Sequence, residues 1–297
     1  MTAHTQSRNR SRLTHHLGQS IIHVFMMIIS IGCILPLLLI VSASFSDEAD
    51  IARYGYSLIP RTFTPYAYSY ILRVPSQIIR AYGVTTFVTV VGTALGMLLM
   101  SLLAYVISRQ DFPWRKQLSF FVFFTMLFNG GLVPWYIWLT QGLHIKDSVW
   151  ALILPHLIVP WYVLLLRTFF AQLPNELLDA ARIDGAGEWR VFFQMILPMS
   201  TPSLATVGLF CILMYWNDWY LALLFIDSPK LHPLQYMLYN IMMNARAIQA
   251  SPQTTGLSLP VNTVRMAMSV LATGPAALIF LALQRYFIRG ITVGALK

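Results

Sequence analysis

The chain has very few charged residues for its length. Of its 297 residues, 10% are Asp, Glu, Lys or Arg, whereas an ordinary globular domain is about one-quarter charged. Apolar residues make up 57% of the chain, and the mean hydropathy is +0.63. A soluble protein with so little charge could not cover its surface with polar side chains. The composition therefore excludes an ordinary soluble domain and indicates an integral membrane protein.

The sequence also lacks the patterns of several catalytic and binding classes. It has no G-x-x-x-x-G-K-[ST] phosphate loop, so it does not supply an ATP site of that type. Its histidines are scattered without metal-ligand spacing, and no nucleophile and base form a hydrolase pattern. Cys33 and Cys211 both lie inside apolar runs, where a disulfide is not expected. We expect a non-catalytic protein with no metal site and no cofactor of its own.

Basic residues exceed acidic ones, and the net charge is +9. A nucleic-acid-binding protein usually gathers its Lys and Arg on one surface. Here they are scattered, with a spacing that fits loops between membrane spans better. Nucleic acid is therefore not an expected partner.

Long apolar runs dominate the sequence. A helix needs about 20 apolar residues to cross a bilayer, and no run alternates as a barrel strand would. The first run follows three arginines, as in a signal peptide, but it is longer than a signal h-region. We predict an all-α membrane protein, with a tail at 1–20 and one transmembrane domain at 21–297. Its six predicted spans lie at about 21–45, 84–108, 118–140, 149–170, 201–226 and 266–288.

The distribution of Lys and Arg predicts the orientation. With the N-terminus inside, the inner segments hold twelve Lys and Arg, and the longer outer segments hold eight. Because positive residues favour the cytoplasmic side, we expect both termini inside (N-in/C-in). The polar stretch between the fourth and fifth spans then lies in the cytoplasm, and the protein is multi-pass in the cell (inner, cytoplasmic) membrane.

That stretch, "DAARIDGAGEWRVFFQMILP" at 179–198, reads as two short helices joined by a turn. Asn175 and Glu176 are typical of a helix start, and Gly185 can adopt positive φ without a Cβ clash. Pro198 is expected to break the second helix. The pattern fits either a compact knob that docks into another protein or an amphipathic loop on the membrane surface.

The stretch resembles the cytoplasmic "EAA" loop of permease subunits in bacterial ABC importers, whose pattern is E-A-A-x-x-D-G-A followed by I-x-L-P. This sequence has D-A-A at 179–181, D-G-A at 184–186 and I-L-P at 196–198. It departs from the pattern in having Asp179 for glutamate and in a final motif one residue shorter.

Four further stretches are similar to the carbohydrate-uptake branch related to the maltose importer permease subunits. Within that branch they look most like the subgroup for complex or acidic oligosaccharides. They are "SLIPRTFTPYAYSYIL" (57–72), "FNGGLVPWYI" (128–137), "YWNDWYLALLF" (215–225) and "QRYFIRGITVGALK" (284–297).

The resemblance implies a permease subunit of an ATP-driven importer that works by alternating access. Its expected partners are a second homologous permease, two ATPase subunits that bind ATP and Mg, an extracytoplasmic solute-binding protein and the lipid bilayer. The loop would be the coupling helix in a cleft of the ATPase. The expected coupling residues are Glu176, Asp179, Ala180, Ala181, Arg182, Asp184, Gly185, Ala186 and Glu188.

The resemblance also implies an oligosaccharide cargo, with an acidic, uronate-type one such as alginate oligosaccharides as the specific hypothesis. A neutral oligosaccharide is the alternative. Hypotheses from other classes are an ATP-independent carrier and a membrane scaffold that binds an ATPase. Inverted repeats or paired broken helices would favour the carrier, and neither is visible in the sequence.

Polar residues within the apolar runs are candidates for the substrate pathway. Asn217 and Asp218 fall near the middle of the fifth predicted span, where polar groups usually face the bundle interior or water. Their aromatic neighbours suit the C–H faces of sugar rings, although an aromatic belt at the membrane interface has the same composition. Irregular backbone at "FNGGLVP" would also be tolerated beside a cavity. The expected pathway residues are Asn129, Trp216, Asn217, Asp218, Trp219 and Tyr220.

Overall fold

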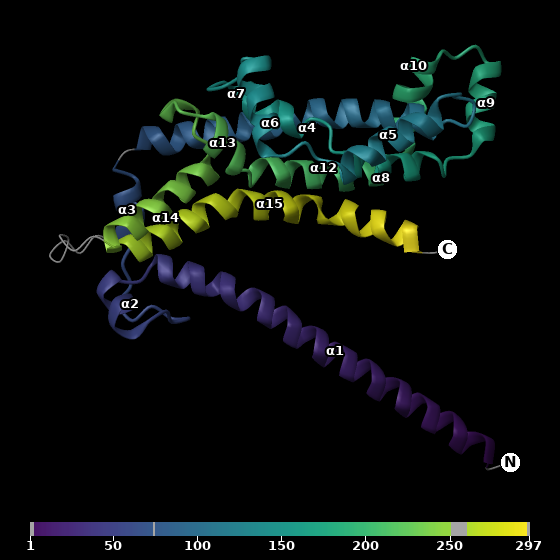
Figure 1. Cartoon of the computed structure of the whole chain (residues 1–297). Coiled ribbons are helices and arrows are strands. Elements are labelled where there is room, and N and C mark those ends of the chain that lie inside the picture. The colour runs from purple at the N-terminus through teal and green to yellow at the C-terminus, as the bar shows by residue number, and fades with distance from the viewer. Residues whose placement is uncertain (1–2, 74, 251–259, 296–297) are drawn as a thin grey trace. The chain divides into compact units, whose positions relative to one another are not determined.

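A computed structural model describes residues 3–73, 75–250 and 260–295 of the chain (Figure 1). Helices make up most of these residues, and no strand occurs among them beyond an isolated bridge between Ser46 and Phe63. The helical class predicted from the sequence is confirmed. The chain forms two compact units, one of Met1–Arg73 with Ser251–Leu271 and one of Val74–Ala250 with Ala272–Lys297.

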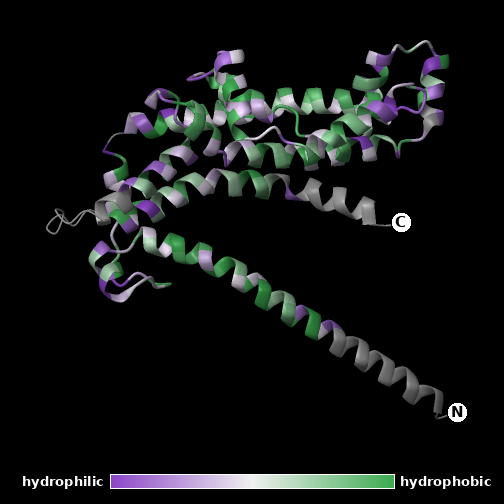
Figure 2. Ribbon diagram, viewed as in Figure 1, coloured by the Kyte–Doolittle hydropathy of each residue, from purple (hydrophilic) through white to green (hydrophobic). Residues whose placement is uncertain are grey.

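The first unit contains three helices and the start of a fourth. They are α1 (Ala3–Ser44), α2 (Glu48–Tyr54), α3 (Tyr66–Ile71) and the first turns of α15 (Val261–Ala295). Most of the stretch Gln19–Ser44 of α1 is apolar and exposed, and only its last residues, Ser42–Ser44, are buried (Figure 2). Such an exposed apolar helix is expected to face lipid. The backbone of residues 3–20, predicted as a separate tail, continues this helix.

The second unit holds the remaining elements. Its helices are α4 (Pro75–Ser108), α5 (Arg115–Leu127), α6 (Leu132–Ile137), η1 (Trp138–Gly142), α7 (Val149–Ile153), η2 (Leu154–His156), α8 (Pro160–Phe170), α9 (Asn175–Ile183), α10 (Glu188–Val191), η3 (Phe192–Ile196), α11 (Leu197–Met199), α12 (Thr201–Trp216), α13 (Tyr220–Phe225), η4 (Pro229–Leu231), α14 (Leu234–Ala250) and the rest of α15. The long helix α4 packs against α8 and α12. Figure 1 shows α9 and α10 at one end of these helices and α7, α13 and α14 toward the other.

Among the described residues, three helical segments are long and apolar enough to cross a membrane: Gln19–Ser44, Pro75–Ser108 and Val261–Ala282. Three further pairs of helices reach that length only when each bent pair is taken as one span, with bends of 111°, 48° and 83°. Length and composition therefore allow three to six spans. The bends fall inside or beside the third, fourth and fifth runs predicted from the sequence.

Local sequence explains two of the bends. Between α5 and α6, the side chain of Asn129 accepts a hydrogen bond from the Gly131 amide at 2.7 Å, and Gly131 has φ +89°. Pro160 begins α8 after an extended Val159, as expected because proline disfavours a helical conformation in the residue before it. The predicted helix break at "FNGGLVP" is thus present.

The break predicted at Pro198 is misplaced. Pro198 lies within α11, which follows the π-helix η3 without interruption. The chain turns at Ser200, whose φ of −99° and ψ of 14° separate α11 from α12.

Close packing of α4 explains its two spaced glycines. A Cβ at Gly92 would lie 2.5–2.8 Å from atoms of the Tyr215 ring, and one at Gly96 would lie 3.0 Å from the Leu157 carbonyl oxygen. Tyr215 in turn donates a hydrogen bond to the carbonyl of Ile153 at 3.0 Å. The G-x-x-x-G pair therefore permits the close approach of neighbouring segments, as such pairs commonly do in membranes.

We predict that Gly92→Ala destabilises the protein by about 1–3 kcal/mol, the usual cost of overpacking a core. The matched control is Gly208→Ala in α12, because nothing lies within 4 Å of a Cβ built there. Thermal unfolding of the detergent-purified protein checks this. Equal melting temperatures for the two variants would contradict the close contact at Gly92.

Candidate functional site: the α9–α10 loop and the aromatic cluster

The stretch 175–191 folds as two helices around one glycine. Gly185 has φ +79°, and its N–H donates to the Arg182 carbonyl while the Ala186 N–H donates to the Ala181 carbonyl. These two bonds form a Schellman motif, which ends a helix with a left-handed residue. The turn predicted at "DG" is present, although Asn175 is the first residue of α9 rather than its cap.

One face of this loop packs against its own unit. Leu178 and Ala181 are buried in a core cluster with residues of α4, α8 and η3, including Tyr105, Phe170 and Phe192. Of the predicted coupling residues, Ala181 therefore faces inward and Ala186 is half-buried. The others are exposed: Glu176, Asp179, Ala180, Arg182, Asp184, Gly185 and Glu188.

Two large, exposed apolar side chains of the loop were not among the predicted site residues. Ile183 is 87% exposed and Trp189 is 67% exposed, and the Trp189 ring stacks on Phe193 with centroids 6.1 Å apart. Exposed apolar side chains beside polar ones are typical of a docking surface. Their exposure depends on the tertiary structure, so the sequence did not distinguish them from core residues.

A network of charged groups joins the loop to the C-terminal end of α4. Arg182 Nη2 lies 2.7 Å from Asp111 Oδ2 and 2.7 Å from Glu188 Oε1. The Tyr105 hydroxyl donates to Glu188 Oε2 at 2.6 Å, and Arg109 Nε lies 3.2 Å from Asp111 Oδ1. Two predicted residues, Arg182 and Glu188, are thus brought together with three that the sequence did not single out.

The network keeps Asp111 ionised. Partial burial raises the pKa of Asp111, but hydrogen bonds from Arg182 and Arg109 outweigh it and lower the pKa from 3.8 to about 2. Because the pKa is lowered in the folded protein, the ionised carboxylate stabilises the fold at pH values above 3.8. That contribution is lost as the pH falls toward 2, so the ion pair is complete at neutral pH.

Five of the six predicted pathway residues, Trp216–Tyr220, lie at the junction of α12 and α13. Helix α12 ends at Trp216, whose buried indole N–H donates to the Ala272 carbonyl at 2.9 Å. Asn217 and Asp218 follow this end of α12. The sequence predicted them near the middle of a span, but here they lie in a break between two helices. Asp218 Oδ1 accepts the N–H groups of Tyr220 and Leu221 and thereby caps α13.

Helix α14 adds polar and aromatic groups that the sequence did not single out. Gln235 Nε2 donates to Asn217 Oδ1 at 3.3 Å. The Tyr239 ring stacks on Trp219 with centroids 4.5 Å apart, and Tyr236 stacks at 6.2 Å on Tyr239. Trp219 remains 38% exposed. Asn129, by contrast, makes its hydrogen bond locally within the α5–α6 connection.

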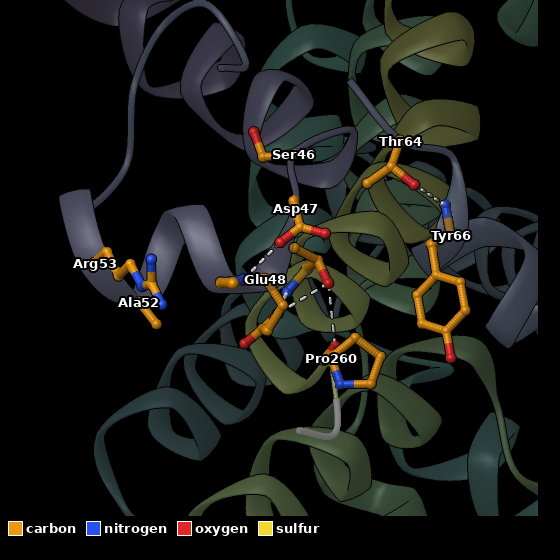
Figure 3. A pocket seen from close by; sticks show the side chains of 10 residues that line it. Ser46, Asp47, Glu48, Ala52, Arg53, Thr64, Tyr66 and Pro260 are labelled. Carbon is orange, nitrogen blue, oxygen red and sulfur yellow. Dashed lines mark hydrogen bonds between the residues drawn. The ribbon is translucent and has the colours of Figure 1, made fainter. Parts of the chain in front are cut away.

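The first unit contains a separate pocket of about 690 Å³, between α2 and the start of α15 (Figure 3). Its wall includes Glu48, whose carboxylate accepts hydrogen bonds from the backbone and side chains of Asn262 and Thr263 at 2.8–3.0 Å. The Asp47 side chain caps α2 by accepting from Ala49. These carboxylates are therefore occupied in holding helix ends.

Residues 114–293 match the family described as "Binding-protein-dependent transport system inner membrane component". The chain belongs to this family. Its members are permease components of ABC transporters, and the relatives that this chain resembles serve sugar and oligosaccharide transport. The family predicted from the loop motif is thus confirmed.

Three relatives show how far the similarity extends. The "Polygalacturonan/rhamnogalacturonan transport system permease protein YtcP" of Bacillus subtilis is 36% identical over 287 residues, covering 96% of this chain and 100% of the relative. "Protein LplC" of the same organism is 37% identical over 265 residues, 89% of each chain. The arabinooligosaccharides permease AraQ of Halalkalibacterium halodurans is 29% identical over 268 residues, covering 89% of this chain and 91% of the relative.

A solved structure shows the same fold. It is a bacterial ABC transporter involved in the import of the acidic polysaccharide alginate, and the matching chain is 24% identical with a TM-score of 0.80. The match covers 92% of this chain and 98% of that one.

We predict that Gly185→Ala loosens the end of α9, because an L-residue in the left-handed region costs about 1–2 kcal/mol. Amide hydrogen exchange over residues 175–186 should become roughly 5- to 30-fold faster. Gly187→Ala is the control, since Gly187 has φ −71° and a Cβ added there would meet nothing within 4 Å. Unchanged exchange in Gly185→Ala would contradict the strained turn.

Proposed function

We propose that this chain is the transmembrane subunit of an ATP-driven oligosaccharide importer, with six spans, both termini in the cytoplasm and alternating access. Its place is the cell (inner, cytoplasmic) membrane, and its transmembrane domain covers 21–297 after the segment 1–20. The observation that carries the proposal is the loop at 175–191. It has the D-G-A motif of the family and D-A-A in place of its E-A-A, and it folds as a compact knob with an exposed apolar tip.

The exposed face of the loop suits a protein partner better than a lipid surface. It combines the small side chain of Ala180 with the apolar Ile183 and the acidic Asp184. Small and apolar groups allow close packing in a groove, while carboxylates disfavour the negatively charged inner membrane surface. The partner is a cytoplasmic ATPase subunit that supplies the ATP and Mg sites.

The proposed coupling residues divide into two roles. Glu176, Asp179, Ala180, Asp184 and Gly185 form the exposed contact face. Ala181 and Ala186 pack toward the core, and Arg182 and Glu188 orient the loop.

The complete transporter has further subunits. It contains a second homologous permease, two copies of the ATPase and an extracytoplasmic solute-binding protein. Alternating access requires two packings of similar free energy, each favoured by a different ligand state. ATP binding on the partner favours one packing, and this chain transmits the change through the loop.

We place the substrate pathway at the cluster where α12, α13 and α14 meet. Stacked rings of Trp219 and Tyr239 offer flat faces to the C–H groups of a sugar, and Tyr220 is 42% exposed beside them. The amides of Asn217 and Gln235 can bond to hydroxyl groups. Trp216 and Asp218 support this region through buried and capping hydrogen bonds. Asn129, which holds the turn between α5 and α6, is proposed as a further lining residue.

We propose an acidic, uronate-type oligosaccharide as the cargo, with alginate-like material as the specific candidate. The name of the 36% identical relative refers to polygalacturonan, an acidic glycan. Relatives named for neutral arabinooligosaccharides and galactooligosaccharides are less similar, at 26–29% identity. A neutral cargo is the alternative, and an ATP-independent carrier or a scaffold are the alternatives from other classes.

We predict that Ala180→Arg weakens binding of the ATPase subunit by about tenfold or more, since a long charged side chain would occupy the contact face. Ile183→Ala should weaken it through loss of apolar contact. Ala171→Arg is the matched control, because Ala171 is an exposed alanine at the end of α8, outside the loop. Co-purification and titration of the ATPase onto nanodisc-embedded permease measure the affinity.

If permeases carrying Ala180→Arg or Ile183→Ala both bind the ATPase at full affinity, the proposed docking face is refuted. Full transport by the permease without any ATPase would favour the independent carrier.

We predict that Trp219→Ala lowers uptake of the oligosaccharide about two- to tenfold, the range expected for loss of one aromatic contact. Trp150→Ala in α7 is the control, since Trp150 is a comparably exposed tryptophan outside the cluster. Uptake is measured in parallel with a uronate oligosaccharide and a neutral one of equal length. Equal losses in both variants would indicate an interfacial aromatic belt instead, and uptake of only the neutral sugar would overturn the acidic cargo.

A further inference from the structure

The connection between α4 and α5 meets the coupling loop at its inner side. Asp111 in this connection and Tyr105 near the end of α4 both bond to residues of the loop. We propose that Asp111 and Tyr105 are positioning residues that lock the loop to α4, so that loop and helix move as one body. This inference rests on the proposed function of the loop in coupling.

Arg182 is at the centre of this network, which we call the lock and which consists of Tyr105, Arg109, Asp111, Arg182 and Glu188. Its Nη2 atom lies 2.7 Å from both Asp111 and Glu188, and its Nε atom lies 3.1 Å from the same Glu188 oxygen. A guanidinium is planar with donors in fixed directions, so it sets the orientation of its partners as well as their distance. One side chain thereby holds α9, α10 and the α4–α5 connection in one arrangement.

The two carboxylates are each shared between the loop and the α4 side. Glu188 accepts from Arg182 through Oε1 and from the Tyr105 hydroxyl through Oε2. Asp111 accepts from Arg182 through Oδ2 and from Arg109. The group contains two cations and two anions, so its charges balance without a contribution from a partner.

Tyr105 anchors the lock in the core, because its ring is buried there. Its side chain is 6% exposed, and its ring lies 5.4 Å from that of Phe192, which is fully buried. Arg167 Nε also donates to the Ile107 carbonyl at 3.3 Å and ties α8 to the same end of α4. A displacement of Glu188 would therefore act on a packed helix rather than on a loose loop.

The lock sets the orientation of the loop on α4 and contributes little to the folding stability of the protein. The side chains of Arg182, Asp111 and Glu188 are 37%, 49% and 54% exposed, and exposed ion pairs contribute little to folding. Burial of Leu178 and Ala181 already holds the loop on the unit. Apolar contact has no preferred direction, so without the network the loop could rotate on its apolar base when the ATPase moves.

The test uses the whole transporter in nanodiscs, with the ATPase affinity and the ratio of substrate-stimulated to unstimulated ATP hydrolysis measured for each variant. Asp111→Ala and Tyr105→Phe should bind the ATPase normally and lower the ratio at least about fivefold, the lower end of coupling between sites. Asp111→Asn, which keeps an acceptor oxygen, should restore part of the ratio. Lys116→Gln is the control, because it removes an exposed charge from the same region.

A double-variant cycle separates the lock from a general structural role. Asp111→Ala combined with Arg182→Gln should be no worse than Arg182→Gln alone, because both remove the same bond. Normal ratios in Asp111→Ala and Tyr105→Phe, or fully additive losses in the cycle, would overturn the inference. If Ala180→Arg still weakens ATPase binding in that case, the proposed docking face stands and only the lock fails.

Discussion

The close packing of α4 is the constraint on which the rest of the second unit depends. In its N-terminal part, Thr85 accepts the N–H of Leu234 at the start of α14. In its middle, Gly92 lies against the Tyr215 ring, and near its C-terminal end Tyr105 bonds to Glu188. One continuous helix therefore contacts α14, α12 and the α9–α10 loop along its length.

Helix α4 is continuous, whereas the helical segments around it are interrupted. The breaks between α5 and α6 and between α12 and α13 leave backbone groups without helical partners, and side chains of Asn129 and Asp218 accept some of the freed N–H groups. Irregular backbone at membrane depth is tolerated only where protein or a water-filled cavity surrounds it. Each break thus has a polar side chain that accepts its freed N–H groups. The break between α12 and α13 also places amide and aromatic groups beside one another.

Much of the fold was predictable because its physical signals are local. Apolar runs of about 20 residues show where helices lie, since a bilayer leaves no other solution for the backbone. The turn at Gly185 was predictable because its left-handed conformation favours glycine. The positions of helix ends were less predictable from the sequence. Pro198 was expected to end a helix and instead lies within continuous helical backbone directly after the π-helix η3, because whether a proline interrupts a helix depends on the hydrogen bonds of the preceding turn.

The sequence by itself determined the membrane class, the family and the position of the loop, because composition, run length and a short motif are properties of consecutive residues. Only the tertiary structure decided which face of the loop is free. Ala181 is buried while Ile183 is exposed, and nothing in their order along the chain distinguishes them. It also decided the partners of Arg182 and Trp219, because Asp111 and Tyr239 lie far away in sequence. Contacts of this kind are created by packing, and packing depends on the whole chain at once.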